Sequence, residues 1–168
     1  MKRVQTIDLN NGYSFVIRWK ITGHYCAYLE VPKENLFFGI DSFALATDYP
    51  ALDDIVHGGI TFADFSSEEN KYYPTGNPED AGKFYLGFDA AHLNDLRYPE
   101  LGKNLDDLTE DDKRLISVMT ESAYKTKMLL EDNATFKNVD FMLKELIKLY
   151  DAVSSFDVRN KEADEDAS

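Results

Sequence analysis

Hydrophobic and polar positions alternate along the first part of the chain. Large apolar side chains occupy every second position of residues 13–19, which is typical of a strand with one buried face. Asn10-Asn11-Gly12, just before this segment, is a turn sequence that tolerates positive φ, so it predicts a hairpin with residues 3–9. Residues 25–31 form a third expected strand, which Pro32 ends.

The middle of the chain predicts shorter elements. Residues 33–53 favour a loop with one short helix, because Gly39 and Pro50 interrupt the apolar residues. The other elements expected here are strand pieces at 55–57 and 60–65 around Gly58-Gly59, a polar loop at 66–82 and a strand at 83–88.

The apolar spacing becomes helical after residue 105. Residues 109–112, Thr-Glu-Asp-Asp, resemble a capping box, and apolar residues then follow a helical period from Ile116 to Leu130. A second helix is expected from Val139 to Val153, again with one apolar face.

Together these elements predict an α+β fold. We expect a mainly antiparallel sheet from the N-terminal two-thirds, with two C-terminal helices packed on one face. Residues 1–157 are expected to form a single globular domain, and residues 158–168 an acidic, disordered tail. The side chains expected to be substantially buried are Trp19, Phe62, Phe88, Leu146 and Tyr150.

Composition narrows the class of protein. The single cysteine of the 168 residues excludes an internal disulfide framework. No apolar run approaches the roughly 20 residues that span a bilayer, and the N-terminus lacks the apolar core of a signal peptide. We therefore expect a protein of the host cell cytoplasm with no membrane partner.

The net charge of −13 is concentrated in the middle of the chain. Residues 34–70 contain eight acidic residues and neither lysine nor arginine. Such a field repels nucleic-acid phosphate and attracts basic surfaces. The block is interpreted either as a solubility feature or as a surface that competes with nucleic acid for the basic groove of another protein.

The three histidines, His24, His57 and His92, each lie beside glycine or alanine at an expected strand edge or turn. If a short helix begins after Asp89, then Asp89 and His92 share a face, as do His92 and Asp95. A carboxylate bonded to one imidazole nitrogen would fix its tautomer and raise its basicity. We expect His57 and His92 to line one cleft, with Asp89 hydrogen-bonded to one of them.

Four segments of the chain resemble, in order and spacing, the blocks of an uncharacterised family of phage, plasmid and bacterial proteins, over roughly residues 22–153. They are GHYCAYLEVPKENLFFG, VHGGITFAD, FYLGFDAAHLND and NVDFMLKELIKLYDAV. Tyr85 replaces the family's more usual tryptophan and Ala90 a common cysteine, so a mechanism that needs that cysteine is not expected. The resemblance implies ancestry in mobile genetic elements and carries over no reaction.

Two interpretations of these residues use no metal and no cysteine. In a structural interpretation, Asp89 caps a helix, the histidines satisfy buried polar groups, and Gly58-Gly59 forms a bulge. In a hydrolytic interpretation, His57 and His92 are general base and acid and either Asp89 or Asp95 orients a ring. This pairing is what metal-independent cleavage of a phosphodiester would need.

Two further interpretations stay open. A metal site could be built from His24, His57, His92 and Asp89, although their wide spacing matches no ligand signature. Alternatively, Cys26 would be a nucleophile paired with His57 or His92, against the simpler expectation that it fills core.

Two classes of function follow. The first is a counter-defence protein of the anti-CRISPR type, acting on a basic nucleic-acid-binding host protein or its guide RNA, by analogy with other small acidic proteins of mobile elements. The second is a hydrolase or RNA-cleaving nuclease, and a non-catalytic structural or interaction domain is a further alternative. The residues assigned are His57, His92, Asp89 and Asp95 as catalytic, and His24, Asp48, Asp53, Asp54, Gly58 and Gly59 as substrate- or partner-binding; neither a cofactor nor a resident metal is expected.

Overall fold

The computed structural model describes residues 4–20, 22–67, 72–92, 95, 114 and 135–159. In chain order its elements are β1 (Val4–Asp8), β2 (Ser14–Trp19), β3 (Tyr25–Val31), α1 (Ser42–Asp48), α2 (Pro50–Asp53), β4 (Phe62–Phe65), the 3-10 helix η1 (Pro78–Asp80), β5 (Phe84–Asp89) and α4 (Val139–Ser154).

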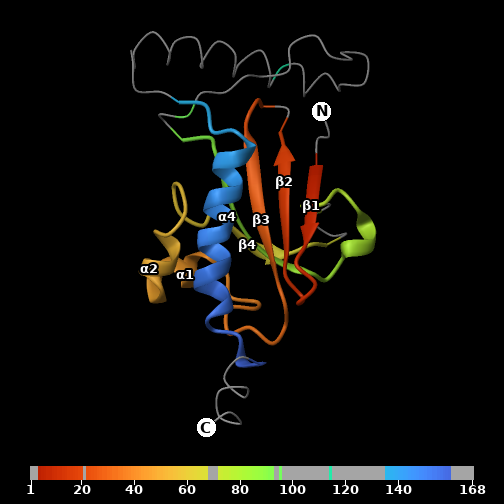
Figure 1. The fold of residues 1–168 in the computed structure, drawn as a ribbon, viewed down its shortest axis with the longest axis vertical. Helices are drawn as coiled ribbons and strands as arrows, with labels where there is room; N and C mark the ends of the chain where they lie inside the picture. Colours follow the sequence, from red (N-terminus) through yellow and green to blue (C-terminus); the bar gives the residue numbers. More distant parts are fainter. Residues whose placement is uncertain are drawn as a thin grey trace.

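The five strands form one antiparallel sheet in the order β1-β2-β3-β5-β4, and α4 packs on one face of it, running lengthwise over β3 (Figure 1). The predicted α+β fold with a mainly antiparallel sheet is confirmed. The first hairpin turns as expected, with φ of 59° at Asn10 and 90° at Gly12. Because β3 pairs with both β2 and β5, it lies at the centre of the sheet.

Strand alternation gives the sheet two different faces. One face packs against α4, and on the other face Tyr72, from the chain between β4 and β5, packs against the buried cluster. The side chains buried on the α4 face include Phe15, Ile17, Ala27, Leu29, Leu86 and Phe88. Those buried on the opposite face are Val16, Cys26, Tyr28 and Tyr85.

Helix α4 forms where the apolar period predicts it. Asn138 caps it, its side chain accepting a hydrogen bond from the N–H of Phe141 at 2.9 Å. Its buried face comprises Met142, Leu146, Leu149 and Val153, joined by one charged residue, Glu145. Helical spacing explains the apolar members, whereas a carboxylate in this row needs a specific partner.

The segment before β4 differs from the prediction. Residues 33–53 hold two short helices, because Pro50 begins a second one at its first helical position. The prediction of a strand at 55–57 is wrong, since these residues form a turn. Asp53 Oδ1 accepts the N–H of Ile60 at 2.9 Å, and both Gly58 and Gly59 have positive φ, so the chain reverses where an extended segment was expected.

The burial predictions hold in part. Trp19, Phe88 and Leu146 are buried, whereas Phe62 and Tyr150 are partly buried at the margins of the two core clusters. The helix expected from Ile116 to Leu130 lies outside the described residues, as does the chain after Arg159. No helix among the described residues has the length and apolar character to cross a membrane.

The C-terminal end of the described chain is tied to the first hairpin through Asp157. This carboxylate is buried and accepts hydrogen bonds from Tyr13 Oη at 2.9 Å and from Arg159 Nε and Nη2 at 2.9 and 2.5 Å. The bonds from Arg159 lower the pKa of Asp157 from 3.8 to about 2 although burial opposes the shift. Val158 and Arg159, predicted to begin a disordered tail, therefore belong to the packed structure; the N–H of Val158 donates to the carbonyl of Glu34.

We predict that Asp157 stabilises the fold at neutral pH and loses this contribution in acid. The carboxyl binds its proton less readily in the folded than in the unfolded chain, so the stabilisation is complete above about pH 4 and falls as the pH is lowered toward 2. Asp157→Asn should cost about 1–3 kcal/mol at pH 7 and reduce the acid dependence, as measured by urea unfolding. The exposed Asp151→Asn on α4 is the control, and equal unfolding curves for both variants would contradict the prediction.

Candidate functional site

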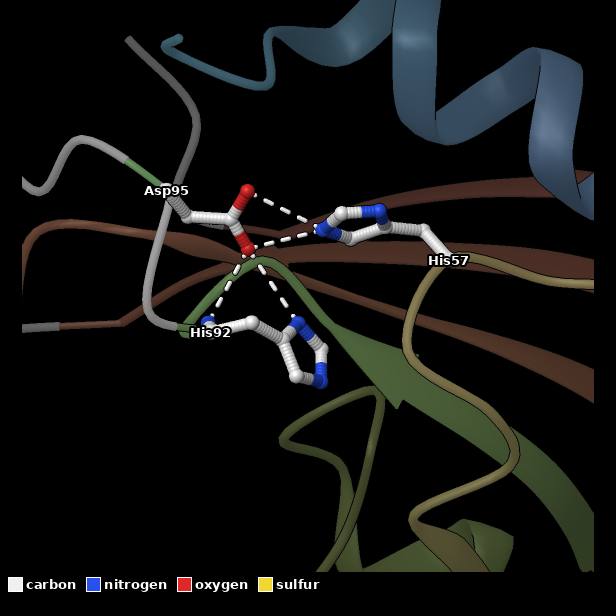
Figure 2. Close-up of side chains that lie close together, drawn as sticks. All are labelled: His57, His92 and Asp95. Atoms are coloured by element: carbon white, nitrogen blue, oxygen red, sulfur yellow. Dashed lines mark hydrogen bonds and ion pairs between the residues drawn. The ribbon is translucent and has the colours of Figure 1, made fainter. Parts of the chain in front are cut away.

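Two of the three histidines meet beside the N-terminal half of α4. His57 lies in the turn after α2, and His92 follows β5. Their ring centroids are 4.9 Å apart and the ring planes are nearly perpendicular. Asp95 lies beside both rings, with its carboxylate facing one nitrogen of each (Figure 2). The structure thus brings together two histidines that the sequence analysis expected to lie together.

The Asp95 carboxylate is the centre of the site. Its side chain is only 1% exposed, and three N–H groups take the place of water around it. His57 Nε2 lies 2.8 and 3.0 Å from the two oxygens, His92 Nδ1 lies 3.2 Å from Oδ2, and the backbone N–H of His92 donates to Oδ2 at 3.0 Å. Burial alone would raise the pKa of Asp95, but the hydrogen bonds from His57 and His92 lower it below its ordinary value. The carboxylate is therefore ionised at neutral pH.

An ionised carboxylate only accepts hydrogen bonds, so the two facing nitrogens carry the protons. This assigns the neutral tautomers: His57 is protonated at Nε2 and His92 at Nδ1. The other two nitrogens, His57 Nδ1 and His92 Nε2, are directed away from the carboxylate (Figure 2). The two side chains are 26% and 34% exposed, respectively. Each ring can therefore offer a basic nitrogen while Asp95 stabilises its protonated form.

Gly58 allows the His92 ring to lie where it does. A Cβ at residue 58 would be 2.0 Å from Nε2 of His92, which is far inside contact distance, and the backbone there has φ of +73°. Both the ring position and the backbone conformation therefore require glycine. This finding answers why the Val-His-Gly-Gly segment carries a glycine directly after the histidine.

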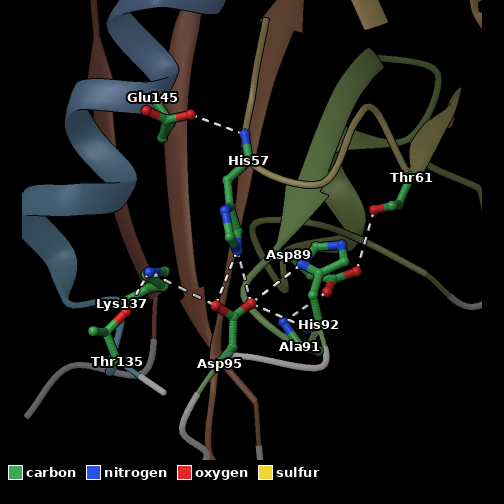
Figure 3. Close-up of polar contacts among 9 residues, drawn as sticks. All are labelled: His57, Thr61, Asp89, Ala91, His92, Asp95, Thr135, Lys137 and Glu145. Atoms are coloured by element: carbon green, nitrogen blue, oxygen red, sulfur yellow. Dashed lines mark hydrogen bonds and ion pairs between the residues drawn. The ribbon is translucent and has the colours of Figure 1, made fainter. Parts of the chain in front are cut away.

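Helix α4 holds the other side of the site (Figure 3). The buried Glu145 carboxylate accepts the backbone N–H of His57 at 2.8 Å. The ring of Phe141 packs edge-on against His57 at 5.4 Å. Lys137, just before α4, places its ammonium 3.9 Å from Asp95 Oδ1 and 5.0 Å over the Phe141 ring. The site thus combines the buried carboxylates of Asp95 and Glu145 with two imidazoles and a lysine.

Asp89 does not have the position predicted for it. Its carboxylate accepts hydrogen bonds from the N–H of Ala91 at 2.9 Å and from Thr61 Oγ1 at 3.2 Å, and Asp95 takes the predicted role beside the histidines. Strand alternation is the reason: Phe88 faces α4, so the next side chain along β5 points to the other face. The described residues Ala90–His92 are also not helical, so the face-sharing argument does not apply to Asp89.

The other predicted site residues lie apart from this cluster. His24 is in the turn between β2 and β3, with Nδ1 2.9 Å from Thr22 Oγ1. Asp48 and Asp54 are exposed on α1 and at the end of α2. Asp53 has a structural role through its bond to Ile60 N–H, and a Cβ at Gly59 would lie 3.1 Å from its carboxylate.

Cys26 does not fit the role of a nucleophile. It is buried on the face of the sheet away from α4, within the cluster of Val16, Tyr28 and Tyr85. Burial raises the pKa of its thiol to about 11, so it stays protonated at neutral pH. It has the core-filling role that the sequence analysis expected.

A polar cavity of about 530 Å³ lies elsewhere, between the first hairpin and the chain around η1. None of the residues predicted for the site lines it. Three of its charged groups pair with one another: Lys83 pairs with Asp80 at 2.8 Å and with Glu30 at 3.4 Å, and Ser14 donates to Glu30. We therefore place the candidate chemistry at His57, His92 and Asp95 and not in the cavity.

Comparison of the chain with protein-family models, curated proteins and solved structures finds no match. The resemblance to phage and plasmid proteins therefore stays an interpretation of the sequence motifs. The candidate site is supported by its own geometry.

Sequence reasoning missed two charged members of the site. Glu145 carried a signal, because it is a charged residue within the apolar row of a predicted helix, beside Met142 and Leu146. Lys137 carried none, since its place depends on how the start of α4 meets Asp95.

We predict that Gly58→Ala destabilises the fold by more than the same change at Gly76. Gly76 has φ of +76°, close to that of Gly58, but no atom lies within 4 Å of a Cβ added there. Both variants bear a left-handed backbone cost of about 1–2 kcal/mol, and only Gly58→Ala must also displace an imidazole, which adds about 1–3 kcal/mol. Denaturant unfolding of the two variants measures the difference, and equal losses would contradict the close contact with His92.

Proposed function

We propose that the protein is a hydrolase of an anionic ester, with a phosphodiester of RNA as the favoured substrate class. The observation that carries the proposal is the convergence of His57 and His92 on the buried Asp95 carboxylate. Histidine is the side chain that most often serves as general acid or base, and two imidazoles next to each other provide one of each. A carboxylate bonded to both fixes their orientation.

Proton transfer in this mechanism uses the nitrogens that face away from Asp95. The ring that is neutral removes a proton from the attacking water or ribose hydroxyl. The other ring, protonated, gives its proton to the leaving oxygen as the bond from phosphorus to that oxygen breaks. Asp95 stabilises each imidazolium through the N–H that points toward it, and it does not need to change its own protonation state.

The charges at the site suit a substrate of negative charge. Lys137 and the two imidazoles are the groups that would contact a phosphate, and Asp95 is shielded by burial. The net charge of −13 opposes binding of free nucleic acid, so we expect the substrate to be RNA held by a basic protein.

We further propose that the role of the protein is counter-defence of the anti-CRISPR type, with binding through the surface formed by α1 and α2. The observation in favour is that Asp48 and Asp54 are exposed there together with Phe43, whose side chain is 80% exposed and lies within the base-free block 34–70. An exposed aromatic side chain among acidic residues suits a basic surface with an apolar pocket.

We predict that His57→Ala and His92→Ala each reduce hydrolysis by roughly 100- to 10,000-fold, the usual contribution of general acid–base catalysis. The assay would use bis-p-nitrophenyl phosphate and guide RNA bound in a CRISPR effector. His24→Ala and Cys26→Ala, which lie outside the cluster, should keep the wild-type rate.

Melting curves separate catalysis from structure for the same two variants. In either variant the buried Asp95 carboxylate loses a hydrogen-bond donor, so each should lower the free energy of unfolding by about 1–3 kcal/mol while most molecules stay folded at room temperature. Loss of activity in molecules that remain folded would support the catalytic role. Activity that falls only in proportion to the folded fraction would support a structural role and contradict the catalytic one.

We predict that binding to a basic nucleic-acid-guided effector weakens as salt rises, and weakens further in the double variant Asp48→Asn/Asp54→Asn. Each charge should contribute about 1 kcal/mol or less, and Phe43→Ala should cost more than about 1 kcal/mol. Asp53 is left unchanged, since it supports the turn before β4. Titration calorimetry measures the affinity of each variant, with Asp151→Asn as the control. If salt, the two aspartate changes and Phe43→Ala all leave the affinity unchanged, the acidic block is a solubility feature only.

A further inference from the structure

We propose that His57 Nε2, His92 Nδ1 and one carboxylate oxygen of Asp95 form a binding site for a divalent transition-metal ion, of which zinc is the favoured example. The inference rests on the proposed function for its catalytic meaning, although binding of the ion is measured on its own. It replaces the ligand set considered from the sequence: Asp95 enters, and His24 and Asp89 do not belong to it.

The distances fit one ion. The ligand atoms of the three residues all lie within 4.8 Å of one another, and the facing nitrogens are 2.8 and 3.2 Å from Asp95 Oδ2. Zinc bonds of about 2.0–2.2 Å put neighbouring ligands about 2.9–3.4 Å apart, depending on the coordination geometry. The widest of these separations can be as large as 4.8 Å, so the ligand atoms would have to move closer by up to about 1–2 Å to hold an ion. Each ligating nitrogen would also give up its proton, and the ring would then carry its proton on the outward nitrogen, His57 Nδ1 or His92 Nε2.

The chemistry of the three ligands selects the kind of ion. Two imidazoles and one carboxylate suit zinc and its first-row neighbours, whereas magnesium and calcium prefer oxygen ligands throughout. Three protein ligands leave at least one position open for water, which is the arrangement of catalytic and not of structural zinc sites. The ion would then take over the activation of water from an imidazole, with the same residues and the same anionic substrate.

Neighbouring groups already fix the ligands. The backbone N–H of His92 holds Asp95 Oδ2, Glu145 holds the backbone of His57, and the contact with Gly58 sets the position of the His92 ring. Such supporting contacts typically contribute tenfold or more to metal affinity. Lys137 acts in the opposite direction, because its ammonium lies 3.9 Å from the carboxylate and repels a cation.

The experiment is calorimetric titration of the full chain with Zn²⁺ after removal of bound metal by a chelator, with Co²⁺ absorption to report imidazole ligands. We expect one strong site, weakened by more than about tenfold in His57→Ala, His92→Ala and Asp95→Asn. His24→Ala and the double variant Asp48→Asn/Asp54→Asn should bind as the wild type does, which separates the site from weak binding to the acidic surface. Lys137→Met should bind Zn²⁺ more tightly, because a positive charge near the ion is removed. Gly58→Ala should bind Zn²⁺ more weakly although it keeps His57, His92 and Asp95, because the added Cβ displaces the His92 ring.

The absence of a strong site in the wild type, or affinity unchanged by the three ligand variants, would overturn the metal proposal. Hydrolysis that persists in chelator and still needs both histidines would likewise contradict a metal requirement, while supporting the acid–base mechanism. Tight Zn²⁺ binding that needs His57, His92 and Asp95 would support the metal site even if no hydrolysis were found, so the two proposals fail separately.

Discussion

The buried carboxylate of Asp95 constrains three parts of the chain that are far apart in sequence. A charged group with almost no exposure must receive several hydrogen bonds in place of water. The turn after α2 supplies the ring of His57, and the segment after β5 supplies the ring and backbone N–H of His92. Lys137 at the start of α4 adds positive charge. The loops at this end of the sheet therefore share one electrostatic requirement, and a change in any of them alters the site.

Helix α4 serves both the fold and the site through one face. Met142 and Leu146 bury apolar area against the sheet, and Glu145 between them accepts the N–H of His57. Its side chain also receives an ion pair from Lys148. A carboxylate in this position costs hydration energy, which its two partners offset. The position of His57 is thereby set by a helix packed on the sheet, and not by the local turn alone.

The pattern of neighbouring residues predicted the sheet and α4, but it did not predict which carboxylate lies beside the two histidines. Period-two strands and the apolar row of α4 were predictable because each depends on neighbouring residues. Asp89 and Asp95 are each three residues from His92, so spacing alone cannot decide between them. The pairing of β5 decides, since Phe88 faces α4 and turns Asp89 away. The turn at residues 55–57 was missed for a similar reason, because it depends on the Asp53 side chain and not on strand propensity.

The exposed acidic residues of α1 and α2 are close in sequence to the candidate site, since a single turn separates Asp54 from His57. At physiological salt a charge acts over about 8 Å. The acidic residues 34–70 therefore affect which molecules can come near the protein, whereas Lys137 and the two imidazoles affect binding only of groups already at the site. A free polyanion would be repelled before it reached these groups. A basic protein carrying RNA would instead be attracted to the acidic residues of α1 and α2. The proposed hydrolysis of RNA and the proposed counter-defence role are therefore compatible with a net charge of −13 only if a basic protein presents the RNA.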